Sequence, residues 1–349
     1  MKKIIIVLGL LAVAVILTWW LNVKLTPTPP STQEKNPLVI GFSLGTIREE
    51  RWFTDRDFFK QRAEELGAAV SVTMSDYDVA LQISQIQNMI SQGIKVIVVI
   101  PSDSEKIAPI IEEAHRAGVR VIAYDRLIKD ADIDLYLSFD NIRVGELEAQ
   151  SIVSVKDRGN FAYIGGSPTD NNAFLLREGT MSVLEPLITN GQISLVVNQL
   201  TEGWKPDEAY KTIKNYLATG QPLDAVVAAN DGTAFGVIQA LKERGLAGKV
   251  PVSGQDAELS ACQRIVDGTQ TATVYKPIKQ LAYRAAEIAV AMAEGHEPDV
   301  NNTTDNGKVQ VLSYFLDPIL VTKENMMTTV VADGFHAADE IYRGQANQP

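Results

Sequence analysis

The chain has 349 residues, a net charge of −11 from 32 Lys and Arg against 43 Asp and Glu, and one cysteine. A single hydrophobic core stops growing at about 250–300 residues, so this length predicts two lobes. The acidic balance would repel a phosphate backbone and argues against a nucleic-acid partner. Cys262 alone can form neither an intramolecular disulfide nor a thiolate metal site, and we expect it in the core.

An uncharged apolar run from Ile4 to Leu21 follows two lysines at the N-terminus. In helical form at about 1.5 Å per residue it would extend about 27 Å, close to the hydrocarbon thickness of a bilayer. The small-residue pattern Ala12-Val13-Ala14 lies inside this run instead of after it, so residues 1–25 are expected to be an uncleaved membrane anchor. A cleaved signal peptide is the alternative. The folded part would lie on the extracytoplasmic side, beyond a Pro- and Thr-rich linker at residues 26–37.

Apolar strand-like runs alternate with segments of helical periodicity from Leu38 onward, a pattern typical of parallel βαβ units. The first half predicts strands at 38–42, 70–74, 96–100 and 119–124, with helices at 54–66, 80–91 and up to 117. The pattern starts again after Asp140, with strands at 161–164, 195–200, 225–229 and 250–253 and helices at 144–155, 173–184, 206–217 and 233–244. A strand at 271–275, a helix at 277–294 and an apolar run at 309–316 follow. We predict an α/β fold of two doubly wound parallel-sheet lobes.

Two short motifs resemble catalytic or metal sites but lack their context. The Gly41–Gly45 segment has the G-x-S-x-G form of a hydrolase nucleophile elbow, yet the next predicted helix begins only near Thr54. Asp130 begins a calcium-loop pattern in which Leu135 replaces the required Gly and Asn141 replaces the required Glu. The chain also lacks the glycine-rich motifs that bind nucleotide phosphates. We therefore expect no metal and no cofactor, and a solvated turn at Asp130.

Polar side chains follow several predicted strands, where open parallel sheets bind their ligands. Recognition of a polyhydroxylated molecule needs Asp and Asn as acceptors, Arg and Lys as donors, and apolar surfaces for its ring faces. Each residue taken singly could instead be a surface ion pair or a helix cap. The repeated position after apolar strands favours a sugar site. The candidate residues are Asp125, Arg126, Asn172, Arg177, Asn230, Asp256 and Lys276, with Arg51, Trp52 and Trp204.

Six segments carry a resemblance to a known family: Glu50–Trp52, Ala123–Arg126, Gly165–Pro168, Asp170–Ala173, Ser253–Ala257 and Thr273–Ile278. In them the chain resembles the periplasmic sugar-binding proteins of the type I fold that serve bacterial ABC importers, above all its xylose-binding members. The resemblance implies two lobes joined by a three-segment hinge, expected at 38–143 with 277–312 and at 144–276 with 313–349. It also implies a monosaccharide, D-xylose, held between the lobes by the candidate residues, with closure on binding.

The partner depends on the N-terminal segment. A receptor of this family would deliver its sugar to the membrane subunits of an ABC importer. An anchored receptor could instead report the sugar to a membrane sensor kinase. A sugar-responsive repressor of the same fold would need a basic DNA-binding head, whose place is taken here by the apolar segment. An enzyme would need a separate acid/base pair, and the candidate carboxylates are matched by Arg and Lys. We expect a binding protein.

Overall fold

The computed structural model describes residues 14–20, 23 and 37–343. The chain divides into two units, residues 1–37 and residues 38–349. Residues 14–20 of the expected anchor at 4–21 are helical, and the rest of that segment lies outside the described residues, as does nearly all of the linker at 26–37. Among the described residues, no helix is both long enough and apolar enough to cross a bilayer.

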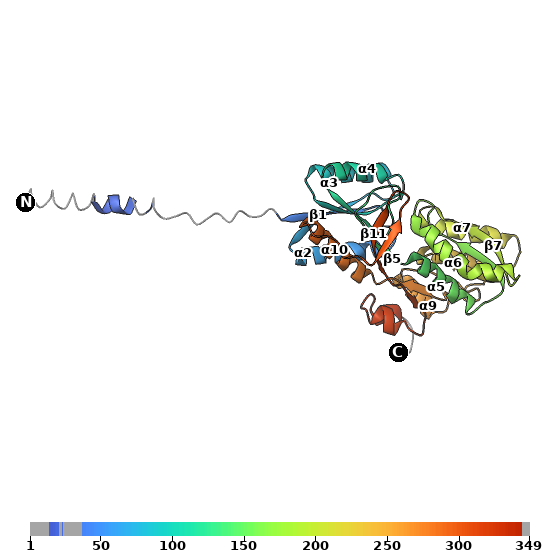
Figure 1. The fold of residues 1–349 in the computed structure, drawn as a ribbon. Helices are drawn as coiled ribbons and strands as arrows, with labels where there is room; N and C mark the ends of the chain where they lie inside the picture. Colours follow the sequence, from blue (N-terminus) through green and yellow to red (C-terminus); the bar gives the residue numbers. More distant parts are fainter. Residues whose placement is uncertain (1–13, 21–22, 24–36, 344–349) are drawn as a thin grey trace, which may run out of the picture. The chain divides into compact units, whose positions relative to one another are not determined.

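The first sheet has seven strands in the order β10-β11-β5-β4-β3-β1-β2. Their bounds are Leu38–Leu44 (β1), Ala68–Met74 (β2), Val96–Ile100 (β3), Arg120–Tyr124 (β4), Leu135–Phe139 (β5), Asn302–Asp305 (β10) and Gln310–Leu316 (β11). The neighbouring strands pair in parallel, except that β10 runs antiparallel to β11. Helices α2 (Arg51–Glu65) and α10 (Ile278–Ala293) cover one face, and α3 (Val79–Ser91) and α4 (Ala108–Arg116) cover the other (Figure 1).

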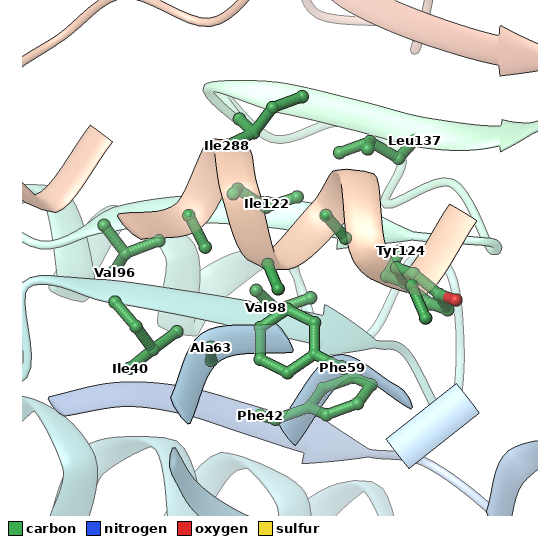
Figure 2. Packing of buried hydrophobic residues seen from close by; sticks show 14 of the residues in the cluster. Ile40, Phe42, Phe59, Ala63, Val96, Val98, Ile122, Tyr124, Leu137 and Ile288 are labelled. Carbon is green, nitrogen blue, oxygen red and sulfur yellow. The ribbon is translucent and has the colours of Figure 1, made fainter. Parts of the chain in front are cut away.

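Side chains of β3 alternate between two apolar layers, which is why its sequence is apolar at every position. Val96 and Val98 pack with Phe59 of α2 and Ile288 of α10 (Figure 2), while Ile97 and other β3 side chains pack under α3 and α4. Full burial of one such aliphatic side chain stabilises the fold by about 1.5–3 kcal/mol. These layers hold the strand ends, and the polar loops that follow them, in fixed positions.

The second sheet repeats this plan with β6 (Gly159–Ile164), β7 (Ile193–Gln199) and β8 (Ala225–Ala228) in the order β7-β6-β8. Single bridges at Val252 and Gln255 connect β8 to β9 (Thr273–Tyr275), which pairs with β12 (Ile319–Val321). The helices of this lobe are α5 (Asn141–Val153), α6 (Asn171–Thr189), α7 (Pro206–Ala218), α8 (Asp231–Lys242) and α9 (Leu259–Val266). Apolar layers lie on both faces, so the predicted class of fold, two doubly wound lobes, is confirmed.

The chain passes between the two lobes three times, after β5, after β9 and after β11. The first and third passages are tied together where the Asp140 N–H donates to the Leu316 carbonyl at 3.2 Å. β11 stays paired with β5 as far as Leu316, which lies beyond the expected end of the first lobe at residue 312. A parallel partner strand therefore draws four more residues into the first lobe.

Several observed elements differ from the sequence predictions. The expected strand at 250–253 is reduced to the bridge at Val252. β5, β10, β12, α9 and the short helix α11 (Ala338–Ile341) were not predicted. β5 is a run of only five residues. α9 has a one-sided apolar face that was not recognised. Cys262 is fully buried in the core beside α9, as expected.

Candidate functional site

A small cavity lies where the strand ends of the two lobes face each other. It is lined by Glu49, Trp52, Asp125, Arg126, Asp170, Asn172, Trp204, Asn230, Gln255, Asp256 and Lys276. Its internal volume is about 20 Å³, room for about one water molecule and far below the roughly 300–1,000 Å³ of ligand pockets. The side chains of the two lobes therefore close almost completely around this space.

Arg51 forms the centre of a buried ion network beneath this cavity. Its Nη2 lies 2.8 Å from Asp125 Oδ2, its Nε lies 3.1 Å from Asp55 Oδ2, and its Nη1 lies 3.5 Å from Asp256 Oδ1. The Tyr124 hydroxyl donates a further hydrogen bond to Asp55. Burial opposes ionisation of Asp125, but Arg51 and then Lys276 outweigh it and hold the pKa of Asp125 below its ordinary value. Asp125 is thus kept as an anionic acceptor.

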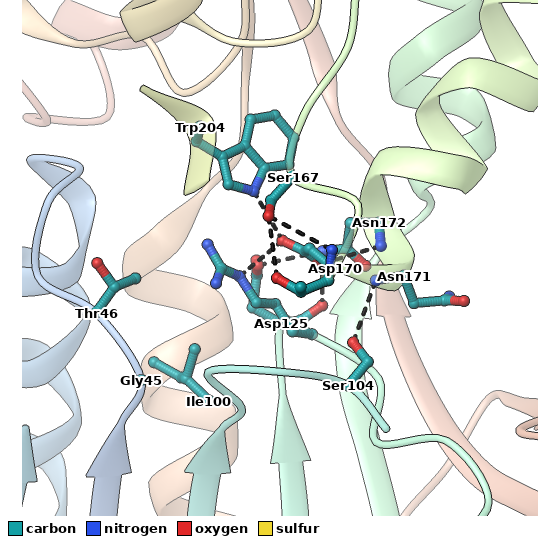
Figure 3. Close-up of polar contacts among 12 residues, drawn as sticks. Gly45, Thr46, Ile100, Ser104, Asp125, Ser167, Asp170, Asn171, Asn172 and Trp204 are labelled. Carbon is teal, nitrogen blue, oxygen red and sulfur yellow. Dashed lines mark hydrogen bonds and ion pairs between the residues drawn. The ribbon is translucent and has the colours of Figure 1, made fainter. Parts of the chain in front are cut away.

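A second ion pair, between Arg126 and Asp170, joins the first lobe to the second. Arg126 Nε lies 2.8 Å from Asp170 Oδ2. The same carboxylate accepts the Asn172 N–H at 3.0 Å, as the N-cap of α6, and the Trp204 indole N–H at 3.1 Å (Figure 3). Burial raises the pKa of Asp170, and the nearby Arg126 only partly offsets this. One carboxylate therefore orients a helix, an indole and a guanidinium.

Two asparagines present amides at helix starts. Asn172 donates through Nδ2 to the Asp125 carbonyl at 3.0 Å. Asn230 is the N-cap of α8, and its Oδ1 accepts the Thr233 N–H at 2.7 Å. The sequence left open whether such residues are helix caps or ligand-site residues. Asn230 is a helix cap and also lines the cavity.

The far side of the cavity carries the pair of Asp256 and Lys276, whose Oδ1 and Nζ are 2.8 Å apart. Asp256 has φ 91° and Asp125 has φ 62°, both in the left-handed region that non-glycine residues rarely adopt. Such strained backbone is concentrated at ligand sites, where surrounding contacts hold it. Here the Asp256 N–H donates to the Val274 carbonyl at 2.9 Å. The two carboxylates are thus aimed by their backbone as well as by their cations.

Two buried indoles supply the apolar walls. Trp52 lies beneath the guanidinium of Arg51 at 4.4 Å and that of Arg126 at 5.3 Å from its ring. Trp204 packs directly on Gly166, where an added Cβ would lie 2.1 Å from the ring. Indoles pack well against the C–H faces of a ring-shaped ligand.

Eight of the ten sequence-predicted residues line the cavity, and Arg51 and Arg177 do not. Arg51 does not line the cavity but pairs with Asp125 and Asp256, which do. Arg177 lies elsewhere: its Nε donates to Asn198 of β7 at 3.2 Å. Arg177 follows Asn172 by five residues in α6, which places it about 140° around the helix at 3.6 residues per turn.

Three cavity residues, Glu49, Asp170 and Gln255, were not among the predicted contacts. Asp170 and Gln255 lie within segments that carried the family resemblance, and Asp170 follows an apolar strand, so a signal for both was present. Glu49 immediately precedes such a segment. The sequence offered no physical reason to choose it over Glu50, because neither side chain's direction can be read from the order of residues.

The two motifs that were set aside have structural roles. Ser43 is buried inside β1, and its hydroxyl accepts a hydrogen bond from Gln82 Nε2 at 3.2 Å. The calcium-like spacing that begins at Asp130 is occupied by β5 from Leu135 onward. Within the described part of the chain, no group of three or more His, Cys, Asp or Glu side chains is arranged to hold a metal ion.

Chemically, this is a cavity in which cations and carboxylates pair with each other. Paired charges offer directional donors and acceptors with little net field, so they suit a neutral polar ligand better than an ion. Contacts from both lobes surround the space, and a ligand bound there would touch both at once.

Comparison with known proteins agrees with this geometry. Residues 40–297 match the model of the family described as periplasmic binding protein domain. The chain is 50% identical over 313 residues to the D-xylose-binding periplasmic protein of Haemophilus influenzae, covering 89% of this chain and 94% of the relative. It is 49% identical over 303 residues to the Escherichia coli protein of the same name, covering 86% and 92%.

A solved structure shares the fold at lower sequence identity. The carbohydrate transporter solute-binding protein of Chloroflexus aurantiacus, in complex with D-glucose, superposes with a TM-score of 0.82 at 31% identity, covering 89% of this chain and 98% of that one. The fold, the interlobe cavity and these similarities agree, and the chain belongs to the periplasmic binding protein family.

Proposed function

We propose that this protein is an extracytoplasmic receptor that binds a monosaccharide, D-xylose first of all, and presents it to an ABC sugar importer. Like the relatives to which it is similar, it is a binding protein and not an enzyme. The observation that carries the proposal is the interlobe cavity lined by paired charges, amides and two indoles. The names of the two relatives near 50% identity support D-xylose as the sugar.

The contact residues proposed for the sugar are those of the cavity wall. Asp125, Asn172, Asn230 and Asp256 supply acceptors and amides, while Arg126 and Lys276 donate. Hydroxyl groups both donate and accept, so each can take a partner from this set. Arg51 acts through Asp125 and Asp256, and Trp52 and Trp204 cover the ring faces. Arg177, which was also a candidate, bonds to Asn198 and does not line the cavity, so it is not among the contacts proposed from the structure.

Binding is proposed to close the lobes. The cavity wall includes residues of both lobes, so a sugar that contacts both has a higher affinity for the closed form and shifts the population toward it. The closed form is then the species that the importer's membrane subunits recognise.

The alternative is a membrane-anchored sensing subunit that reports xylose to a sensor kinase. The apolar run from Ile4 to Leu21 favours it, because a tethered receptor would remain beside one membrane partner. Washing membranes with high salt and then with alkaline carbonate separates the two forms. An anchored chain stays with the membrane fraction, and a cleaved chain is released and begins after the apolar run.

The ligand is tested by calorimetric titration of the chain with D-xylose, L-arabinose, D-ribose and D-glucose. The proposal predicts a dissociation constant of about 1 µM or lower for D-xylose, corresponding to about −8 kcal/mol, and weaker binding of the epimers. A misplaced hydroxyl leaves a buried partner group unpaired, which costs about 1–3 kcal/mol. If none of the four sugars binds, the ligand class is wrong.

A further inference from the structure

Glu49 lines the cavity with a carboxyl group of which one oxygen has no hydrogen-bond partner in the protein. Its Oε2 accepts the indole N–H of Trp52, while its Oε1 is buried and has no hydrogen-bond partner. The side chain is 7% exposed and lines the cavity. Buried polar atoms are hydrogen-bonded with few exceptions, and an exception at a ligand cavity needs a physical reason.

The position of Glu49 also differs from that of the other cavity carboxylates. Asp125, Asp170 and Asp256 each have an ion-pair partner at 2.8 Å. Arg126 is the cation with the largest electrostatic effect on the Glu49 carboxyl group, and it acts through space and not through an ion pair. Its carboxyl group therefore has no part in the ion network, and its contacts are with the Trp52 indole and with its own backbone N–H.

Glu49 lies where the inner cavity meets an outer hollow. Together with Trp204 and Asn230 it lines both the cavity and a neighbouring pocket that includes Arg48, Phe235 and Glu258. A ligand in the cavity would thus meet the Glu49 carboxyl group on the side of the opening. The Trp52 contact fixes the direction of the group, so the unsatisfied oxygen needs no reorganisation to bind a ligand hydroxyl.

We propose that Glu49 is a ligand-binding residue whose Oε1 forms a direct hydrogen bond with one hydroxyl of the bound monosaccharide. This inference rests on the function proposed above and adds a contact that the family resemblance does not include. It makes Glu49 a specificity determinant, since a sugar that lacks or misplaces that hydroxyl would leave a buried carboxyl oxygen unpaired.

The test is a double-mutant cycle between the protein and the sugar. Affinities are measured for D-xylose and its 1-, 2-, 3- and 4-deoxy analogues with the wild-type chain and with Glu49→Ala. The wild-type chain should bind one analogue at least tenfold more weakly than D-xylose because of this contact. In Glu49→Ala the loss for that analogue should shrink to threefold or less, while the losses for the other analogues stay as in wild type.

The control is Glu64→Ala, which removes an exposed carboxylate of α2 that pairs only with Lys60, at 3.7 Å. It should reproduce every wild-type ratio. Should Glu49→Ala fail to fold, Glu49→Leu keeps an apolar side chain of similar bulk but has no polar atom for the sugar, and it is used for the same cycle with the same shrinkage expected. Unchanged ratios for all analogues in a folded Glu49 variant would overturn the inference. A wild-type chain that binds no monosaccharide would refute the function on which the inference rests.

Discussion

The guanidinium of Arg126, in the first lobe, lies 2.8 Å from the carboxylate of Asp170, in the second. Neither side chain is more than 4% exposed, so this ion pair is made inside the cavity and not on its rim. A buried ion pair is costly to form and costlier to leave half-made, because the remaining charge loses its partner. The ion pair between Arg126 and Asp170 can therefore form only when the two lobes lie close together.

The cavity charges should be indispensable for sugar binding. Arg126→Ala leaves Asp170 unpaired, and Asp256→Ala does the same to Lys276. Each variant should weaken binding of D-xylose by about 2 kcal/mol or more, as one side of a buried charged hydrogen bond is lost. Calorimetric titration measures this, and Arg158→Ala, which removes an exposed partner of Asp157, is the matched control. Normal affinity in both cavity variants would mean that the site is elsewhere.

Arg177 offers a comparison with Arg126, since both are arginines named from the sequence. Its guanidinium bonds to Asn198 of β7 and does not line the cavity. Arg177→Ala should therefore change the affinity for D-xylose by less than about threefold, below about 0.7 kcal/mol. A loss as large as that of Arg126→Ala would place Arg177 in the sugar site, as the family resemblance implies.

The wall formed by Trp204 should be sensitive to one methyl group. In Gly166→Ala the new Cβ would lie 2.1 Å from the indole ring, so Trp204 must move. We expect the affinity for D-xylose to fall at least tenfold, or about 1.4 kcal/mol. Gly232→Ala is the matched control, because its added Cβ makes only ordinary contacts of 3.6 Å with Asn230. Equal affinities in the two variants would show that Trp204 does not cover the ligand.

Stability should depend on pH through two carboxyl groups beside the Asp256 loop. Burial raises the pKa of Asp231 to about 7 and that of Glu258 to about 8. Both lie above the values of 3.8 and 4.5 expected for the unfolded chain, so the folded state binds more protons in between. The stability that the neutral forms provide is complete below the unfolded values and is lost as pH rises through the folded values.

Between about pH 5 and 8 the free energy of unfolding should therefore fall. The scale is on the order of 1.4 kcal/mol for each unit by which the pKa of the fully buried Asp231 is raised. The contribution of Glu258 is screened, since that side chain is only half-buried. Urea unfolding at a series of pH values measures the fall, and Glu258→Gln should flatten its upper part. Stability that rises over this range would contradict the assignment.

The sequence predicted the fold well where burial leaves a clear pattern. β3 is apolar at every position because both of its faces are covered, and the helix expected at 80–91 is observed as α3, Val79–Ser91. It failed where pairing in space decides the structure. β5 is a strand because β4 and β11 lie on either side of it.

The site was predictable to a similar degree. Residues directly after strands, such as Asp125 and Asp256, could be named because parallel strands end at one edge. Arg177 lies within the helix α6, where the direction of a side chain depends on its position around the helix axis, and the order of residues alone did not show that it points away from the cavity. Glu49 could not be found from the sequence, since its importance rests on an unsatisfied oxygen that only the packing of Trp52 reveals.

The central claim is that a monosaccharide binds between the lobes, and a crystal structure of the chain grown with D-xylose tests it most directly. The account predicts one sugar ring between Trp52 and Trp204, with hydroxyl groups bonded to Asp125, Arg126, Asn172, Asn230, Asp256 and Lys276. A sugar bound elsewhere on the chain, or an empty interlobe cavity at saturating D-xylose, would contradict it.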